Sequence, residues 1–170
     1  MPDVIIRKGQ AGDEKEFAHV QVQSWISVFS HILPGETMQR MTDETRIENM
    51  YARLLREGDD NLYLLSVDGM GSCIAGWNRD RSGAMARTAE LICIHALPDA
   101  RGKGYGSGMM ERILQDIALT GAYDWVVLWV FEKNTRARRF YEKHGFCATE
   151  CRKDSFGATE MMYMKKLAKV

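Results

Sequence analysis

The chain has 170 residues, 45% hydrophobic and 27% charged, which fits one ordinary globular domain spanning residues 1–170. Lysine plus arginine and aspartate plus glutamate number 23 each, so no global field favours nucleic acid or an anionic membrane as a partner. We also expect a cytoplasmic protein, because the sequence shows neither a membrane-length apolar run nor a signal-peptide pattern at its N-terminus.

The N-terminal third predicts one strand and two or three helices. Residues 4–7 are apolar enough for a strand, and glycines then break it before Asp13. Residues 13–29 carry apolar side chains at helical spacing, and Asp13 with Glu16 resembles a capping box. The charged stretch 36–57 has an apolar stripe that suits one or two further helices.

Strands dominate the middle of the chain. Residues 62–67 and 73–78 flank Asp68-Gly69, a strong hairpin signal. Residues 88–96 form the next expected strand. Simple alternation puts its side chains on two faces, one set being Ala89, Leu91, Cys93 and His95, and the other Glu90, Ile92, Ile94 and Ala96.

The C-terminal part alternates helices and strands. We expect a helix over residues 109–118, a strand covered on both faces over 124–131, a helix from Asn134 to His144, and strands over 147–152 and 158–166. The strand–helix–strand order of residues 88–131 is a crossover unit, which requires a parallel pair. The fold class is therefore mixed α/β.

Glycines at positions 102, 104, 106 and 108 lie between a predicted strand and a predicted helix. Glycine lets the backbone approach a ligand closely, and a helix N-terminus offers unpaired N–H groups, so this turn predicts a phosphate site. Arg101 and Lys103 add positive charge beside it. Lys103 is followed by Gly104 instead of Ser or Thr, which excludes a Walker loop, and a dinucleotide fingerprint fits poorly.

Two motifs follow each other in this region. The first is Ala96-x-Pro98-x-x-Arg101-Gly102-x-Gly104-x-Gly106, and the second, about thirty residues later, is Asn134-x-x-Ala137-x-x-Phe140-Tyr141-x-x-x-Gly145-Phe146. Both resemble motifs of the GNAT superfamily of acetyl-CoA-dependent N-acetyltransferases, in which the first is similar to the pyrophosphate loop. With a looser match around Ser24-Trp25 and Leu33-Pro34, the resemblance spans nearly the whole chain.

The resemblance implies a single-domain acetyltransferase fold. Its central mixed sheet would have about six to seven strands, flanked by helices, with a splay between the fourth and fifth strands. Acetyl-CoA would be the co-substrate, and no metal is expected. The implied cofactor-binding residues lie on the strand, on the glycine-rich turn and on the later helix: Ile94, His95, Ala96, Arg101, Gly102, Lys103, Gly104, Tyr105, Gly106, Asn134 and Tyr141.

Two residues are the candidates for catalysis under this resemblance. Tyr141 would be the general acid that protonates the leaving thiolate of coenzyme A. Glu90 would be the general base that takes the proton of the amine, with His95 as its rival. No cysteine is expected to carry the acetyl group, although Cys93 lies near the expected thioester.

The acceptor amine is not identified by the sequence, and a small-molecule amine or a peptide or protein amine both fit. Trp25, Trp77, Trp125 and Trp129 could line its pocket or belong to the core. A homodimer and a longer acyl donor also stay open. A non-catalytic, CoA-responsive binding or regulatory protein is the alternative function, and a nucleotide-binding module is a third.

Overall fold

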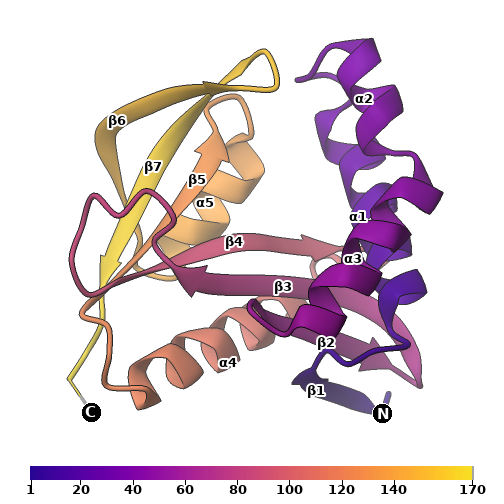
Figure 1. Cartoon of the computed structure of the whole chain (residues 1–170), viewed down its shortest axis with the longest axis horizontal. Helices are drawn as coiled ribbons and strands as arrows, with labels where there is room; N and C mark the ends of the chain where they lie inside the picture. The colour runs from indigo at the N-terminus through magenta and orange to yellow at the C-terminus, as the bar shows by residue number, and fades with distance from the viewer. Residues whose placement is uncertain (170) are drawn as a thin grey trace.

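A computed structural model describes residues 1–169 and shows a seven-stranded sheet in the order β1-β2-β3-β4-β5-β7-β6 (Figure 1). Its strands are β1 Val4–Lys8, β2 Asn61–Val67, β3 Met70–Arg79, β4 Thr88–Ala96, β5 Trp125–Phe131, β6 Cys147–Ser155 and β7 Ala158–Lys166. Neighbouring strands are antiparallel except β4 and β5, which are parallel, as the crossover unit predicts. The predicted mixed fold is confirmed.

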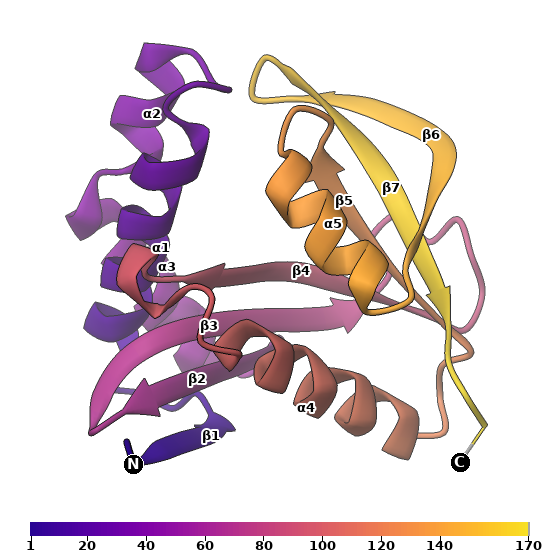
Figure 2. The same ribbon diagram turned by 180° about the vertical axis from the view of Figure 1, so that it is seen from behind.

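Five α-helices and one short 3-10 helix complete the described residues. They are α1 Glu14–Phe29, α2 Gly35–Met41, α3 Glu44–Glu57, the 3-10 turn η1 Pro98–Ala100, α4 Tyr105–Leu119 and α5 Thr135–Lys143. Two views from opposite sides show α1, α2 and α3 on one face of the sheet and α4 and α5 on the other (Figures 1 and 2). No helix within residues 1–169 has the length and apolar character needed to cross a membrane.

The two faces of the sheet carry separate cores. Met109, Met110, Ile113 and Ile117 of α4 pack on the sheet in the larger cluster, together with Tyr141 and Phe146. On the opposite face, the smaller cluster joins Phe17 and Val20 of α1 and Ile47 and Tyr51 of α3 to Leu64 and Ile74. A helix therefore covers each face along its apolar stripe.

The predicted capping box at the start of α1 is wrong. The side chain of Asp13 makes no capping bond and accepts instead from both terminal nitrogens of Arg7, at 2.7 and 2.9 Å. Glu16 accepts from the backbone N–H of Gly71 at 2.6 Å, across the chain from its own helix. Both carboxylates therefore bond to groups outside α1, and neither caps the helix.

The parallel ladder between β4 and β5 is short. It runs from Thr88 opposite Trp125 to Leu91 opposite Leu128 and then stops, while β4 continues to Ala96 and β5 to Phe131. Each strand keeps its other neighbour over that length, since β4 pairs with β3 and β5 with β7. The predicted splay between the fourth and fifth strands is confirmed, and it opens at Ile92 and Trp129.

A β-bulge at Ile92 begins where the splay begins. Trp77 of β3 faces Leu91 and Gly76 faces Cys93, so Ile92 is an extra residue without an opposite partner. A bulge of this kind shifts the alternation of side chains by one position. The predicted division of the strand into two faces is therefore wrong after Leu91.

The true faces follow from the partners on β3. Ile94 and Ala96 lie opposite Ala75 and Cys73 and pack with Ala89 and Leu91 in the cluster under α4. Cys93 and His95 lie opposite Gly76 and Ile74, on the face of α1 and α3. Glu90 alternates with Ala89 and Leu91 and so shares that second face. The bulge brings Glu90, Cys93 and His95 to one side of the sheet.

Candidate active site

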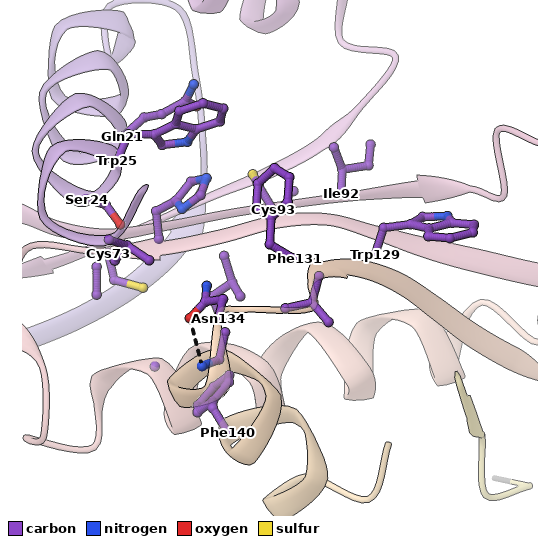
Figure 3. Close-up of a pocket in the computed structure, with 18 of the residues that line it drawn as sticks. Gln21, Ser24, Trp25, Cys73, Ile92, Cys93, Trp129, Phe131, Asn134 and Phe140 are labelled. Carbon is purple, nitrogen blue, oxygen red and sulfur yellow. Dashed lines mark hydrogen bonds between the residues drawn. The ribbon is translucent and has the colours of Figure 1, made fainter. Parts of the chain in front are cut away.

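A single continuous cleft of about 950 Å³ passes through the splay. Side chains of α1 and α3 line one end, and the glycine-rich turn and α5 line the other. Figure 3 shows Gln21 and Trp25 on the α1 side of the strands, with Asn134 and Phe140 on the opposite side. The volume is within the range of pockets that hold small ligands, and the cleft connects the two faces of the sheet.

The glycine-rich turn presents a row of free backbone N–H groups at the cleft. Arg101 N–H bonds to Pro98 and Gly108 N–H bonds to Gly104, but the N–H groups of residues 102–107 find no acceptor within residues 1–169. Gly102 and Gly104 hold φ angles of 74° and 85°, which glycine adopts without strain. Free N–H groups at a helix N-terminus attract anions, so the geometry of this turn suits an anionic group such as a phosphate.

The two cations of the turn lie apart. Lys103 is exposed, whereas the Arg101 guanidinium turns inward and donates to the carbonyl of Ala96 at 3.2 Å and to Ser24 Oγ at 3.3 Å. Burial, followed by the nearby Arg136, lowers the pKa of Arg101. Arg101 therefore ties the end of β4 to α1, and the anion site depends mainly on backbone groups and the helix dipole.

The free edge of β4 faces the cleft. Leu97 N–H donates to Ser72 on the β3 side, and successive residues of a strand point their backbone groups to opposite edges. The backbone groups of Ile94 and Ala96 therefore point into the splay, where β5 offers them no ladder partner and, among the described residues, only the Ala96 carbonyl is bonded, to Arg101. Such groups suit the amides of an extended ligand arm, because buried backbone groups require partners.

Helix α5 places Asn134, Phe140 and Tyr141 at the cleft. Asn134 caps the helix, its Oδ1 accepting from Ala137 N–H at 3.2 Å, which leaves its amide nitrogen free for a ligand (Figure 3). Phe140 packs against Gly106, where an added Cβ would lie 3.5 Å from the ring. A Cβ at this position would make an ordinary contact with the ring, so the approach of α4 and α5 does not require glycine here.

Tyr141 is 9% exposed, and its ring packs between Phe140, Phe146 and Tyr163. Its hydroxyl makes no hydrogen bond within residues 1–169, and the residue lines the cleft. Burial raises the pKa of Tyr141 well above 10, so the hydroxyl keeps its proton at neutral pH. The geometry offers a phenol O–H that is free to donate into the cleft.

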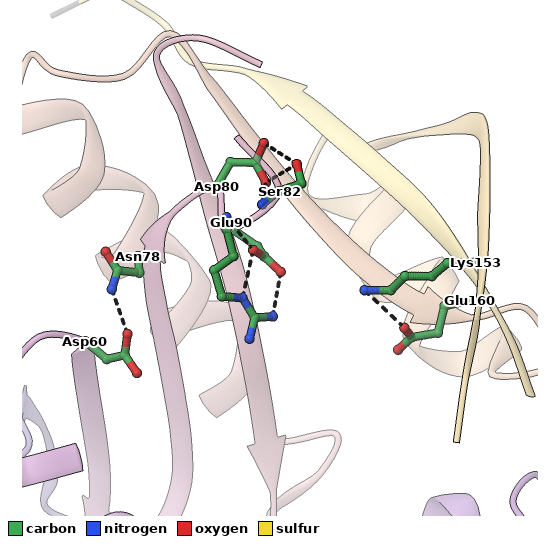
Figure 4. Close-up of polar contacts among 8 residues, drawn as sticks. Asp60, Asn78, Asp80, Ser82, Glu90, Lys153 and Glu160 are labelled. Atoms are coloured by element: carbon green, nitrogen blue, oxygen red, sulfur yellow. Dashed lines mark hydrogen bonds and ion pairs between the residues drawn. The ribbon is translucent and has the colours of Figure 1, made fainter. Parts of the chain in front are cut away.

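Glu90 is 4% exposed and paired with Arg81 (Figure 4). Oε1 accepts from Arg81 Nη2 at 2.7 Å, and Oε2 accepts from Arg81 Nε at 3.0 Å and from its backbone N–H at 3.1 Å. A carboxylate has about four acceptor positions. Because Arg81 uses three of them, one position remains for a water or an amine.

Two other groups of β4 lie on the same face as Glu90. Burial, with Arg101 as the second cause, lowers the pKa of His95 to about 4, so its imidazole is neutral at pH 7. Burial raises the pKa of the Cys93 thiol to about 12, which makes it a poor nucleophile at neutral pH. No group of three or more metal-binding side chains gathers anywhere in residues 1–169.

Several residues of the site are absent from the sequence predictions. Arg81 is one, because it lies in the turn after β3 and only the folding of this turn back onto β4 brings it to Glu90. Ser107 Oγ lies 3.1 Å from His144 Nε2, a contact that links the first turn of α4 to the end of α5. Phe29, Phe131 and Phe156 join Trp25 at the other end of the cleft. Aromatic residues this far apart in sequence carry no local signal that they meet.

Comparisons with known proteins agree with this geometry. A model of the acetyltransferase (GNAT) family matches residues 23–146. An uncharacterized N-acetyltransferase from Archaeoglobus fulgidus is 28% identical over 138 residues, covering 80% of this chain and 88% of that protein. A mycothiol acetyltransferase from Beutenbergia cavernae is 35% identical over 86 residues, which are 50% of this chain and 28% of that protein.

Among solved structures, the PaiA N-acetyltransferase from Thermoplasma acidophilum in complex with coenzyme A has a TM-score of 0.77 to this chain at 19% identity. The superposition covers 96% of this chain and 99% of that one. At this identity, the likeness shows a shared fold.

The glycine-rich turn generates the first prediction. In Gly104→Ala the Cβ is strained at a φ of 85°, so the turn relaxes and its N–H groups move off the diphosphate position. We expect the dissociation constant of coenzyme A to rise about 10-fold, a loss of about 1.4 kcal/mol, by isothermal titration calorimetry.

The matched control is Gly58→Ala. Gly58 ends α3 with a φ of 71° and equally open surroundings, so it carries the same strain far from the turn. It should lower stability without changing the affinity for coenzyme A. Equal affinities in all three proteins would contradict the assignment of the diphosphate to this turn.

Proposed function

Because this chain belongs to the GNAT acetyltransferase family, we propose that it transfers an acetyl group from acetyl-CoA to a primary amine by direct attack in a ternary complex. The observation that carries the proposal is the splay of β4 and β5, which opens beside a turn of free N–H groups. The bound coenzyme A of the structural relative from Thermoplasma acidophilum supports the choice of donor.

The donor would bind with its diphosphate on residues 102–107 and its pantetheine arm along the free edge of β4. Ile94 and Ala96 would bond its amides, and the amide nitrogen of Asn134 would bond the same arm from α5. A backbone N–H between Ile94 and Ala96 would also bond the thioester oxygen. A hydrogen-bond donor held in place stabilises this oxygen most when the oxygen becomes negative, as it does during attack.

Attack by the amine forms a carbon–nitrogen bond and breaks the carbon–sulfur bond, so the sulfur leaves as a thiolate. In this proposal Tyr141 donates its proton to the sulfur, which a phenol that is buried and free of other partners can do. Proton transfer by a positioned side chain contributes about 100- to 10,000-fold to a rate. The resulting tyrosinate would recover its proton from water after the products leave.

The proton of the amine must also leave for the reaction to proceed. Glu90 is the proposed base, acting through a water at the one acceptor position that Arg81 leaves open. Arg81 would be a positioning residue, because it compensates a buried charge that is otherwise costly. His95 is the weaker candidate, because burial and the nearby guanidinium of Arg101 oppose the positive charge that its imidazole would gain on accepting a proton.

The experiment that tests the function is a thiol-release assay with acetyl-CoA and a broad panel of amines. We expect amine-dependent release of free coenzyme A and no acetylated protein when the amine is omitted, since the Cys93 thiol is protonated. Binding of coenzyme A with no release for any amine would favour the alternative, a CoA-responsive regulatory protein.

Tyr141→Phe should lower kcat about 100-fold and leave the affinity for acetyl-CoA unchanged, because the ring still packs but the proton donor is gone. Steady-state kinetics and calorimetry measure the two quantities. Tyr123→Phe is the control, because Tyr123 packs on Trp77 and does not line this cleft. Equal turnover in wild type and Tyr141→Phe would remove Tyr141 from the acid role.

Glu90→Gln should lower kcat/KM about 10- to 100-fold at neutral pH, because the amide is nearly isosteric and cannot accept the amine's proton. A base requirement predicts that much of the loss is recovered at high pH, where the free amine is already neutral. The control is Asp154→Asn on exposed β6, which should leave the profile unchanged. A loss that is the same at every pH would indicate a structural role for Glu90.

A further inference from the structure

The end of the cleft opposite the glycine-rich turn is walled by aromatic rings. Trp25 packs edge-on to Phe29 with ring centroids 4.8 Å apart, and edge-on to Phe156 at 5.8 Å. Phe29 in turn packs edge-on to Phe131 at 5.3 Å. These four rings, with Trp129, come from α1, from β5 and from the tip of the β6–β7 hairpin, and all line the cleft. We call them the aromatic wall.

The aromatic wall stands where an amine must enter. Phe131 and Trp129 lie on the part of β5 that has separated from β4, directly across the splay from Cys93 (Figure 3). Figure 1 shows the β6–β7 tip reaching toward the N-terminal helices, and Gly157 in that tip sits against Pro34. The wall therefore encloses the acceptor side of the cleft between the two halves of the molecule.

The carboxylates of this region are already paired within the chain. Glu90 is held by Arg81, and Glu160 lies 3.6 Å from the ammonium of Lys153 (Figure 4). Asp60 accepts from the side-chain amide of Asn78 at 2.7 Å. Lys153 also lies over the ring of Trp129, 4.4 Å from its centroid. Two of these three carboxylates therefore face a cation of the protein and Asp60 faces a neutral amide, so a substrate with several positive charges would have to enter past Arg81 and Lys153.

One polar group of the aromatic wall lacks a partner. Trp25 is 8% exposed, and its indole Nε1 is buried without any hydrogen-bond partner in residues 1–169. Leaving such a donor unpaired is unfavourable, and native proteins rarely do so without a reason. The Trp25 side chain lines the cleft, but Nε1 itself is covered by protein atoms in this structure, so an oxygen of a bound molecule would satisfy it only after neighbouring side chains shift.

We propose that the acceptor is a small amine that carries an aromatic ring and a carbonyl oxygen near its amino group. The ring would pack against the aromatic wall, the oxygen would accept from Trp25 Nε1–H, and the amino group would face the splay beside Glu90. This inference rests on the proposed function and narrows its substrate class. It excludes polyamines as preferred substrates.

The first test compares four amines in the thiol-release assay: 2-phenylethylamine, phenylalaninamide, cadaverine and spermidine. Burying a phenyl ring that water would otherwise surround should raise kcat/KM about 30-fold for the two aromatic amines over the two aliphatic ones. Release with cadaverine or spermidine at equal or higher efficiency overturns the inference and leaves acetyl transfer intact. Failure of all amines in the broad panel overturns the proposed function as well.

The second test isolates the indole N–H. Trp25→Phe keeps an aromatic ring in the wall and removes the donor. It should lower kcat/KM about 10-fold for phenylalaninamide, which has a carbonyl oxygen. For 2-phenylethylamine, which has none, kcat/KM should change less than about 2-fold. Trp125→Phe is the control, because Trp125 lies at the paired end of β5 outside the cleft. Equal losses for the two amines overturn the contact with Trp25.

A third variant tests the role of the aromatic wall independently, in case Trp25→Phe folds poorly. Phe156 is 40% exposed in the β6–β7 turn, at a φ of 54°. Phe156→Asn removes the ring and suits that left-handed backbone, so folding should be preserved. It should lower the efficiency of both aromatic amines relative to cadaverine, with the affinity for acetyl-CoA unchanged. An unaltered ratio of aromatic to aliphatic amines overturns the role of the aromatic wall.

Discussion

The separation of β4 from β5 after Leu91 and Leu128 is the constraint on which the rest of the molecule depends. Each strand remains fixed by its outer neighbour, so the sheet opens at its centre without losing its edges. The open edge leaves backbone groups in need of partners, and the cleft through the splay gives a ligand access to them. The fold thus exposes unpaired backbone groups in the middle of the sheet, whereas a complete ladder between β4 and β5 would pair them all.

The bulge at Ile92 lies on β4 at the point where this opening begins. An extra residue increases strand twist and ends regular pairing, and bulges often occur beside active sites for that reason. Here it has a second effect, since it moves Cys93 and His95 to the face that already holds Glu90. The irregular residue therefore coincides with the opening of the sheet and decides which side chains of β4 meet there.

Electrostatics divides the cleft into two different environments. At the glycine-rich turn, free N–H groups and a helix N-terminus favour an anion, and Arg101 is turned away to hold β4 to α1. At the other end, carboxylates are neutralised by cations of the same chain and aromatic rings form the wall. In the proposed function, a charged donor and a mostly apolar acceptor would therefore bind on opposite faces of the sheet and meet at the splay.

The sequence by itself determined the order of the elements and the position of the glycine-rich turn. Glycine spacing, apolar periodicity and turn dipeptides are local properties of the chain, so Gly102, Gly104 and the start of α5 at Asn134 could be identified from neighbours in sequence. The motif around Tyr141 identified its helix in the same way. The capping box at Asp13 was wrong because Arg7 and Gly71, which hold its two carboxylates, compete from outside the helix.

Only the tertiary structure decided which side chains share the cleft. The bulge at Ile92 is defined by the register of β4 against β3, and alternation alone therefore assigned Ile94 and His95 to the wrong faces. Arg81 reaches Glu90 because the turn after β3 folds back onto β4, and Trp25 meets Phe131 and Phe156 across more than half of the chain. Packing between distant elements fixes these contacts, and no pattern within a short window of sequence carries that information.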